Sequence, residues 1–255
     1  MKNALVTGAT SGIGFACAQI LAKRGCNVIL VGRDWDKLEK AHLALQKSGR
    51  HVLCQSDIIE KNRLQNGIHN ALRDIRQTKL DICVHSAGDS QKNPDTREEL
   101  RRLIEVNAIG TLNVLEAVIP LMKTGGHIGA LSSLGSLVRL KAGVSPYVTS
   151  KVAMNEICEG LRAGIEEKGM TLTVAYPAIV DTPMVRNLSK PSVTFRAFKW
   201  HEPSKAAQTI LRDIEAGRRE SYLTLGHRLL VPFARACPFL FAHAIQMFIK
   251  ARTKR

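Results

Sequence analysis

The sequence lacks the features that mark a secreted, disulfide-bonded or repeat protein. Its six cysteines are scattered, none forms a CxxC pair, and a chain of 255 residues does not need disulfides to fold. No signal-peptide pattern precedes the apolar run ALVTG at residues 4–8, and no repeat or low-complexity segment is present. We therefore expect reduced thiols packed as small hydrophobic side chains, no metal site, and a cytoplasmic protein without an N-terminal targeting segment.

Acidic residues are absent from the last part of the chain. Residues 227–255 contain six Lys and Arg residues but no Asp or Glu, whereas the whole chain has 37 basic and 22 acidic residues, a net charge of +15. Such a local excess attracts an anionic partner, which can be a phospholipid surface, a phosphorylated substrate, an acidic carrier protein or nucleic acid. Because no nucleic-acid-binding module is recognisable, we do not expect nucleic acid.

The same segment is rich in apolar residues, which raises the question of membrane contact. Residues 229–248 are long enough to cross a bilayer, but Pro232, Pro238, Arg235 and His243 argue against a spanning helix. Two interpretations stay open. Residues 229–255 either form an amphipathic element that lies peripherally on an anionic membrane, or they pack on the domain or on a partner subunit.

What is present is a regular alternation of short apolar runs and helical patterns. The apolar runs predict strands at residues 4–8, 27–32, 51–57, 80–88, 127–133, 171–177 and 221–226. Strands that are apolar throughout, each followed by a helix, indicate a parallel sheet covered on both faces. We therefore predict an α/β fold with a doubly wound parallel sheet, formed by one domain over residues 1–226, and a C-terminal apolar and basic extension over 227–255.

A glycine-rich turn, TGATSGIG at residues 7–14, follows the first predicted strand. Its glycines permit a tight turn and let the backbone approach a pyrophosphate, which binds at a helix N-terminus. Ligands of doubly wound folds bind at the carboxyl ends of the strands, so we expect a dinucleotide at this turn. The residues expected to contact it here are Gly8, Thr10, Ser11, Gly12, Ile13 and Gly14.

The residues after the second strand bear on which dinucleotide binds. Arg33 suits the 2′-phosphate of NADP, because a guanidinium pairs with phosphate through two parallel hydrogen bonds. Asp34 can instead reach a ribose hydroxyl, so NAD stays an alternative. We predict NADP, with further contacts to the adenine and ribose at the ends of the third and fourth strands, from Asp57, Ile58, Ala87 and Gly88.

A tyrosine and a lysine in the motif YVTSK are spaced for proton transfer. Tyr147 and Lys151 lie at i and i+4, on one face of a predicted helix. The ordinary tyrosine pKa of about 10 is too high for exchange at neutral pH, and a nearby ammonium lowers it. Ser132 and Ser133 end the preceding strand, Asn107 lies in the helix after strand four, and the loop 177–183 follows strand six.

Taken together, these motifs resemble the short-chain dehydrogenase/reductase family, in its compact single-domain branch. The resemblance covers residues 4 to about 226 and rests on TGATSGIG, the asparagine of VNAIG, the serine pair, YVTSK and the loop YPAIVDTP. It implies a Rossmann-fold catalytic domain with Tyr147 as general acid/base and Lys151 binding the nicotinamide ribose and lowering the tyrosine pKa. It also implies roles for further residues: Ser133 orients the substrate carbonyl, Asn107 supports a water-linked proton relay, and the nicotinamide end is held by Pro177, Ile179 and Thr182.

Three positions depart from the family's usual pattern. His85 begins HSAG where NNAG is usual, and we expect a structural hydrogen bond from it rather than catalysis. Ala178 replaces a usual glycine. The interval from Ser133 to Tyr147 is one residue longer than usual, so Ser132 is the alternative for the substrate-orienting serine.

The loop over residues 184–202 is where the family builds its substrate pocket. It interleaves aromatic residues with cations, which suits an apolar or lipid-like substrate with an anionic group, although the aromatic residues can instead simply pack on the core. We predict an NADP(H)-dependent carbonyl reductase or alcohol dehydrogenase. The alternative is a non-catalytic NADP(H)-binding sensor or tethering protein. We also expect a homo-oligomer, with a dimer favoured over a tetramer.

Overall fold

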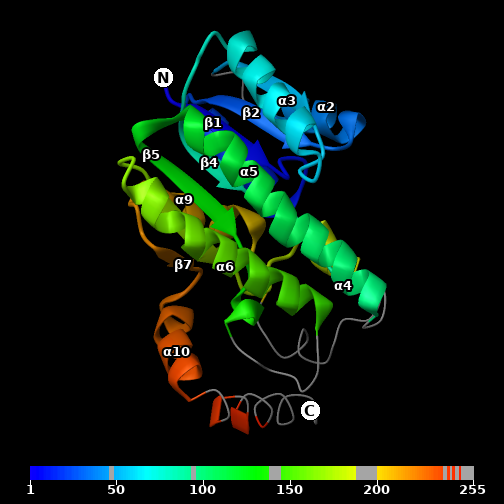
Figure 1. The fold of residues 1–255 in the computed structure, drawn as a ribbon, viewed down its shortest axis with the longest axis vertical. Helices are drawn as coiled ribbons and strands as arrows, with labels where there is room; N and C mark the ends of the chain where they lie inside the picture. The colour runs from blue at the N-terminus through cyan, green and yellow to red at the C-terminus, as the bar shows by residue number, and fades with distance from the viewer. Residues whose placement is uncertain are drawn as a thin grey trace.

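A seven-stranded parallel sheet forms the centre of the protein in the computed structural model (Figure 1). The structure describes residues 1–45, 49–92, 96–137, 145–187, 200–237, 240, 241, 243, 244 and 247. The strand order is β3-β2-β1-β4-β5-β6-β7. The strands are β1 (Asn3–Thr7), β2 (Asn27–Gly32), β3 (His51–Gln55), β4 (Leu80–His85), β5 (Met122–Leu131), β6 (Thr171–Tyr176) and β7 (Glu220–Tyr222). The predicted doubly wound α/β fold is confirmed.

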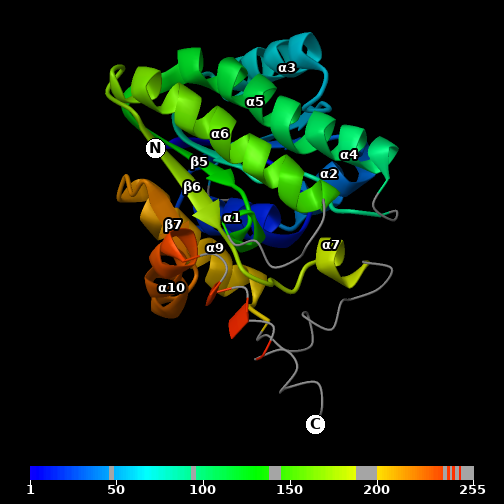
Figure 2. The ribbon, with the colours of Figure 1, turned by 60° about the horizontal axis from the view of Figure 1, so that its bottom comes forward.

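Helices cover both faces of the sheet, which explains why the strands are apolar throughout (Figure 2). In β1, the Leu5 side chain packs with the helices of one face, whereas Ala4 and Val6 pack with those of the other. The first face is covered by α3 (Lys61–Asp74), α5 (Gly110–Val118) and α6 (Pro146–Glu166). The second is covered by α1 (Gly12–Lys23), α2 (Trp35–Leu43) and α9 (Pro203–Glu215). The six cysteines are unpaired, and five of them are buried.

One helical run is continuous from α4 (Arg97–Ile104) through α5 to a short 3₁₀ turn at Ile119–Leu121. Its length and composition alone would allow it to cross a membrane, but 56% of its most apolar stretch is buried inside the fold, as in the core helix of a globular domain. Within this run, a π-helical turn at Glu105–Ile109 joins α4 to α5. Such insertions occur frequently at functional sites, and this one contains Asn107.

The C-terminal part of the described chain differs from the prediction in one respect. The last strand was predicted to run to Gly226, but β7 ends at Tyr222 and α10 (Leu225–Ala236) begins three residues later. The reason is local: the Thr224 side chain accepts a hydrogen bond from the backbone N–H of His227 and so starts the helix. The predicted boundary at 226/227 therefore falls in the first turn of α10. The short helix α7 (Pro183–Arg186) follows β6.

Candidate active site

A cavity of about 300 Å³ lies at the carboxyl ends of the strands, and its lining comes from segments spread along the first three quarters of the chain. The strand order reverses between β1 and β4, which is where ligands of doubly wound sheets bind. Fifteen predicted site residues line the cavity: Gly8, Thr10, Ser11, Gly12, Ile13, Arg33, Asp57, Ile58, Ala87, Gly88, Ser133, Tyr147, Lys151, Pro177 and Thr182. Among the described residues, three predicted ones do not line it: Gly14, Asn107 and Ile179.

The glycine-rich turn places the N-terminus of α1 at this cavity. Gly8 and Gly12 have φ values of 64° and 57°, a region that side chains other than glycine's disfavour. A Cβ at Gly8 would lie 2.7 Å from the backbone N of Ala87, and a Cβ at Gly14 would collide with the carbonyl oxygen of Gly8. Gly14 therefore packs the helix against the turn instead of lining the cavity. The unpaired N–H groups of the first helical turn suit an anion such as a pyrophosphate.

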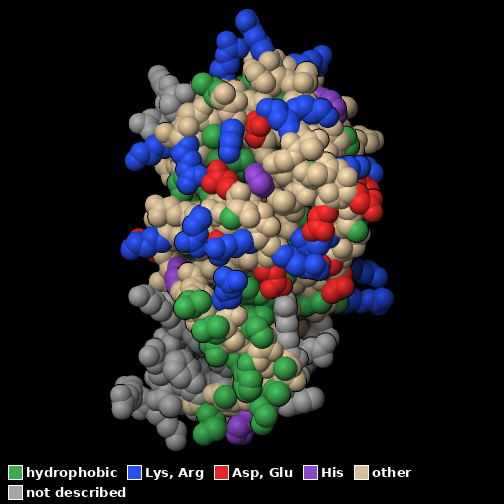
Figure 3. Space-filling model, turned by 90° about the vertical axis from the view of Figure 1, so that its left-hand side faces the viewer, with side chains coloured by type: hydrophobic (Ala, Val, Ile, Leu, Met, Phe, Trp, Pro, Cys, Tyr) green, Lys and Arg blue, Asp and Glu red, His purple; other side chains and the backbone are tan. Residues whose placement is uncertain are grey.

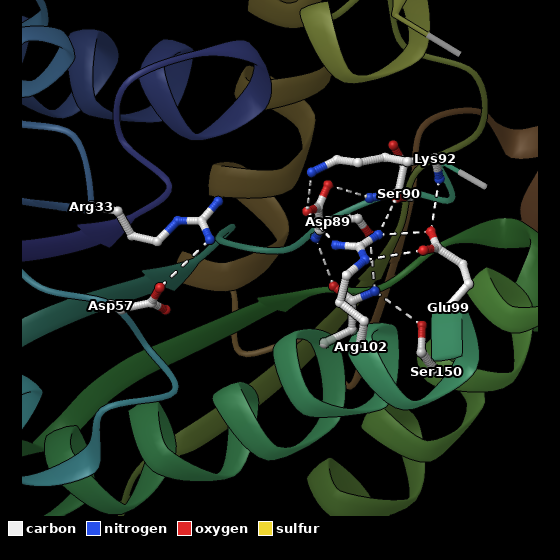
Figure 4. A network of polar contacts seen from close by, with 9 residues as sticks. Arg33, Asp57, Asp89, Ser90, Lys92, Glu99, Arg102 and Ser150 are labelled. Carbon is white, nitrogen blue, oxygen red and sulfur yellow. Dashed lines mark hydrogen bonds and ion pairs between the residues drawn. The ribbon is translucent and has the colours of Figure 1, made fainter. Parts of the chain in front are cut away.

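Arg33 and Asp57 face each other across the outer end of the cavity (Figure 4). Arg33 Nη1 lies 3.5 Å from Asp57 Oδ2, and 61% of the arginine side chain is exposed. Asp34, whose possible contact with a ribose hydroxyl kept NAD as an alternative, bonds to Lys37 of α2 instead. Its carboxylate caps α2 by accepting the backbone N–H of Lys37, and it forms an ion pair with the Lys37 ammonium at 2.8 Å. Among the described residues, Asp34 does not line the cavity.

Asn107 lies behind Gly88 and holds the segment after β4. Its amide Nδ2 donates to the Asp89 carbonyl at 2.9 Å, and its Oδ1 accepts the Asp89 backbone N–H at 2.8 Å. Nδ2 also donates to Ser150 Oγ at 2.9 Å. A Cβ at Gly88 would lie 2.8 Å from Asn107 Oδ1 and 3.3 Å from Lys151 Nζ. Asn107 is fully buried, so it holds the cavity wall at Gly88 from behind without itself lining the cavity.

An ion-pair network on α4 supports the same segment, and nothing in the sequence analysis pointed to it (Figure 4). Arg102 donates to Asp89 Oδ2 at 2.6 Å, to Glu99 Oε1 at 2.8 Å and to the Ser90 carbonyl at 3.0 Å. Lys92 pairs with Asp89 at 2.9 Å, and Glu99 accepts the Lys92 backbone N–H at 2.7 Å. Burial raises the pKa of the Asp89 carboxyl, but its hydrogen bonds and cationic neighbours outweigh burial and lower it. The only sequence signal was T-x-x-E at 96–99, a capping pattern.

His85 sits in a buried chain of hydrogen bonds beside the site. Thr111 Oγ1 donates to the Asn107 carbonyl, so it accepts from His85 Nε2 at 2.9 Å. His85 Nδ1 therefore accepts from Thr7 Oγ1 at 2.8 Å, and Thr7 Oγ1 accepts the Ala87 N–H at 3.1 Å. Burial, and secondarily the Lys151 charge, lower the His85 pKa to about 3. The imidazole is therefore neutral and links β1, β4 and α5.

The two serines after β5 have different partners. Ser133 lowers the pKa of Tyr147, both residues line the cavity, and Ser133 Oγ accepts the Gly135 backbone N–H at 3.2 Å. Ser132 Oγ lies 3.2 Å from Ser136 Oγ, which itself donates to the Ser133 carbonyl and accepts from Asn155 Nδ2. Ser132 also lines the cavity, but Ser133 is the serine that acts on the pKa of Tyr147, which favours Ser133 over Ser132.

The pKa of Tyr147 departs from the sequence prediction. We expected Lys151 to lower it, but burial raises it above its ordinary value, and the Ser133 hydrogen bond only partly opposes this. Lys151 Nζ points to the Leu131 carbonyl at 3.0 Å and the Met154 sulfur at 3.6 Å. Burial lowers the pKa of Lys151 itself to about 8. The physical reason is that desolvation dominates both groups, which disfavours the phenolate and the ammonium alike.

The described part of the predicted substrate loop is short. Of residues 184–202, positions 188–199 lie outside the described residues, including the aromatic residues Phe195 and Phe198. Met184 and Val185 of α7 line the cavity, and Trp200 is 39% exposed. Within the described residues, no group of His, Cys, Asp or Glu side chains could hold a metal ion.

The chain is similar to known oxidoreductases. The sequence model of the short chain dehydrogenase family matches residues 2–192. An uncharacterized oxidoreductase of Staphylococcus epidermidis is 33% identical over 188 residues, which cover 72% of this chain and 80% of that protein. A 7α-hydroxysteroid dehydrogenase solved with NADH and 7-oxo glycochenodeoxycholic acid superimposes with a TM-score of 0.77 at 21% identity, covering 89% of this chain and 93% of that one.

A second solved structure, a 3-oxoacyl-[acyl-carrier protein] reductase from Brucella melitensis, superimposes with a TM-score of 0.71 at 23% identity, over 86% of this chain and 88% of that one. At these identities the two structures show the fold alone, whereas the family match and the staphylococcal relative cover most of the sequence. The chain belongs to the short chain dehydrogenase family of nicotinamide-dependent oxidoreductases.

Proposed function

We propose that the protein is an NADP(H)-dependent carbonyl reductase or alcohol dehydrogenase. The observation that carries the proposal is that Ser133, Tyr147 and the buried Lys151 line one cavity together with the glycine-rich turn. Gly8 and Gly88 let the segments that line the cavity pack closely, since a Cβ would lie 2.7 Å from the Ala87 backbone N or 2.8 Å from Asn107 Oδ1. When bound there, the nicotinamide supplies or accepts the hydride.

The residues of the chain move the proton. Tyr147 donates its hydroxyl proton to the carbonyl oxygen as the alcohol forms, and the Ser133 hydroxyl hydrogen-bonds the same oxygen. Tyr147 is protonated at neutral pH and so carries the proton to be donated, but because burial raises its pKa, donation needs a group that stabilises the phenolate. Lys151, with a pKa of about 8, is mostly charged at neutral pH and stabilises the phenolate left behind.

The preference for NADP rests on Arg33. Its guanidinium is exposed at the end of the cavity where the second strand ends, and the competing acid, Asp34, is committed to capping α2. We expect Arg33→Ala to weaken NADPH binding about 10- to 100-fold, as for the loss of charge-assisted hydrogen bonds, and to leave NADH binding nearly unchanged. Fluorescence titration of both cofactors measures this.

Arg63→Ala is the matched control. Like Arg33, Arg63 is 61% exposed and pairs with one carboxylate, at 3.3 Å, but it does not line the cavity among the described residues. Its replacement should leave both affinities unchanged. Equal loss of NADPH and NADH affinity in Arg33→Ala would contradict the role in 2′-phosphate recognition.

The substrate is proposed to be apolar or lipid-like. The described cavity wall on the nicotinamide side contains Val180, Met184 and Val185, and the sequence of the substrate loop adds aromatic and basic residues. We expect kcat/KM for a series of methyl ketones to rise with chain length. A flat series, or preference for small sugars, would contradict the proposed substrate class. A homodimer is likewise a proposal, and sedimentation analysis of the full chain tests it.

The catalytic role is tested with Tyr147→Phe. We expect the loss of turnover with NADPH and a reactive aromatic ketone, while the NADPH dissociation constant stays within about twofold, because only the proton donor is removed. Tyr222→Phe is the control, since its hydroxyl bonds to Glu220 outside the cavity. Turnover retained by Tyr147→Phe would refute the mechanism. NADPH binding by the wild type without turnover of any ketone or alcohol would instead support a non-catalytic sensor.

A further inference from the structure

The helix α10 presents a stripe of large apolar side chains to solvent. The exposed fractions of Leu225, Leu229, Leu230 and Phe233 are 70%, 68%, 50% and 49%. Their spacing places them along one side of the helix, while Val231 and Ala234, which are buried, face the protein. Figure 3 shows hydrophobic side chains gathered at the lower end of the molecule, where Figure 1 places α10. A patch of this kind on a surface helix marks an interaction site.

The charge around this stripe has one sign. Glu220 is the last acidic residue of the sequence, so residues 221–255 contain six Lys and Arg residues and no acid. Arg228, within α10, is exposed beside the stripe. An anionic bilayer complements both the apolar stripe and the positive charge. Its acyl region accepts apolar side chains in any arrangement, and its headgroups pair with the cations. A second copy docked through the same face would bring two acid-free basic surfaces together, which like-charge repulsion opposes.

The stripe also lies on the side of the sheet where the strands have their carboxyl ends, which is the side of the cavity. α10 follows the carboxyl end of β7, and the ring of His227 packs against that of His201, with 5.9 Å between the centroids. The His201 backbone N–H donates to the Ile179 carbonyl, and its carbonyl accepts the Asp181 N–H, both at 2.9 Å. These bonds flank Val180, which lines the cavity. A partner surface that binds α10 would therefore lie on the same side of the protein as Val180 and the cavity.

We propose that the apolar stripe of α10 (Leu225, Leu229, Leu230 and Phe233) docks into the interface of an anionic lipid bilayer, with Arg228 on the lipid phosphates and the acid-free, basic composition of residues 221–255 favouring the anionic surface. The docking is a binding property of the full chain. It stands or falls independently of the reaction and of the choice between NADP and NAD.

Vesicle flotation of the full-length protein tests the proposal. We expect the protein to float with vesicles of phosphatidylcholine mixed with phosphatidylglycerol, to stay in the bottom fraction with pure phosphatidylcholine, and to dissociate as salt rises. The double variant Leu229→Gln/Phe233→Gln should bind the anionic vesicles at least about tenfold more weakly, because it removes the two most central apolar side chains. Its circular dichroism and NADPH binding should match the wild type.

Leu43→Gln is the matched control, since Leu43 at the end of α2 is 73% exposed but lies in another part of the fold. It should float like the wild type, whereas Arg228→Gln should float less at moderate salt. The proposal is overturned if the wild type floats with neither vesicle, or if Leu229→Gln/Phe233→Gln floats undiminished. A double variant that changes from dimer to monomer, in a protein that never binds vesicles, would assign the stripe to a protein interface and also overturn it.

Discussion

Replacing His85 with asparagine should reduce the pH dependence of stability. His85 is 1% exposed, and its pKa is lowered to about 3 by burial and, to a smaller extent, by the charge of Lys151. The ordinary histidine pKa is about 6.5. Between about pH 6.5 and pH 3, the His85 imidazole is protonated in the unfolded chain but stays neutral in the folded protein. The stability that the neutral imidazole contributes is therefore fully present above about pH 6.5 and is lost progressively as pH falls toward 3.

The magnitude follows from linkage. One proton of difference changes the free energy of unfolding by about 1.4 kcal/mol per pH unit, so this histidine alone should cost about 2–3 kcal/mol between pH 7 and about pH 4.5. Asparagine keeps one donor and one acceptor for the bonds to Thr111 and Thr7 but does not titrate. His85→Asn should therefore lose about 1–2 kcal/mol at pH 7, from imperfect packing, and lose less than the wild type on acidification.

Urea unfolding followed by circular dichroism, at several values between about pH 4.5 and 7.5, measures the slope. Some slope should remain, because burial also lowers the pKa values of His127 and His227. His69→Asn, at an exposed position on the surface of α3, is the control for the substitution itself. If His85→Asn kept the full wild-type slope, the neutral, bridging histidine in the hydrogen-bond chain would be refuted.

Two further predictions concern the support of the site. Arg102→Met should lower the free energy of unfolding by about 2 kcal/mol, since it removes two charge-assisted hydrogen bonds to the buried Glu99 carboxylate, and adding Glu99→Gln should recover part of the loss in urea titrations. It should also weaken NADPH binding by releasing Asp89, and an unchanged affinity would contradict that link. Gly14→Ala should destabilise the protein by at least about 1–3 kcal/mol and abolish NADPH binding, because its Cβ collides with the Gly8 carbonyl. A variant as stable as the wild type, with normal titration, would show that the turn can relax.

The sheet and the cofactor turn were predictable because their signals are local. Uniformly apolar runs such as residues 27–32 can be buried only in a sheet covered on both faces, and the structure places them there. The turn at residues 7–14 likewise needs glycine at Gly8 and Gly12 for its positive φ values. In both cases a short stretch of sequence specifies its own conformation.

The remaining features depend on which residues the fold brings together. The contact of Arg102 with Asp89 joins α4 to the segment after β4, and the pattern of either segment alone does not indicate it. The raised pKa of Tyr147 was not predicted, because the i, i+4 spacing shows that Lys151 is near but not that desolvation outweighs its charge. Similarly, the position of Asp34 after the second strand suggested a contact with a ribose hydroxyl. The structure shows instead that its carboxylate caps α2.

The most direct test of the central claim is the transfer of hydride itself. The wild-type protein is incubated with NADPH carrying deuterium at the nicotinamide C4 position and with an apolar ketone, and the alcohol is analysed by mass spectrometry. We predict that deuterium appears at the carbinol carbon with the wild type and with Tyr222→Phe, and not with Tyr147→Phe. Tight NADPH binding without deuterium in any alcohol across a broad ketone panel would contradict the assignment as a carbonyl reductase.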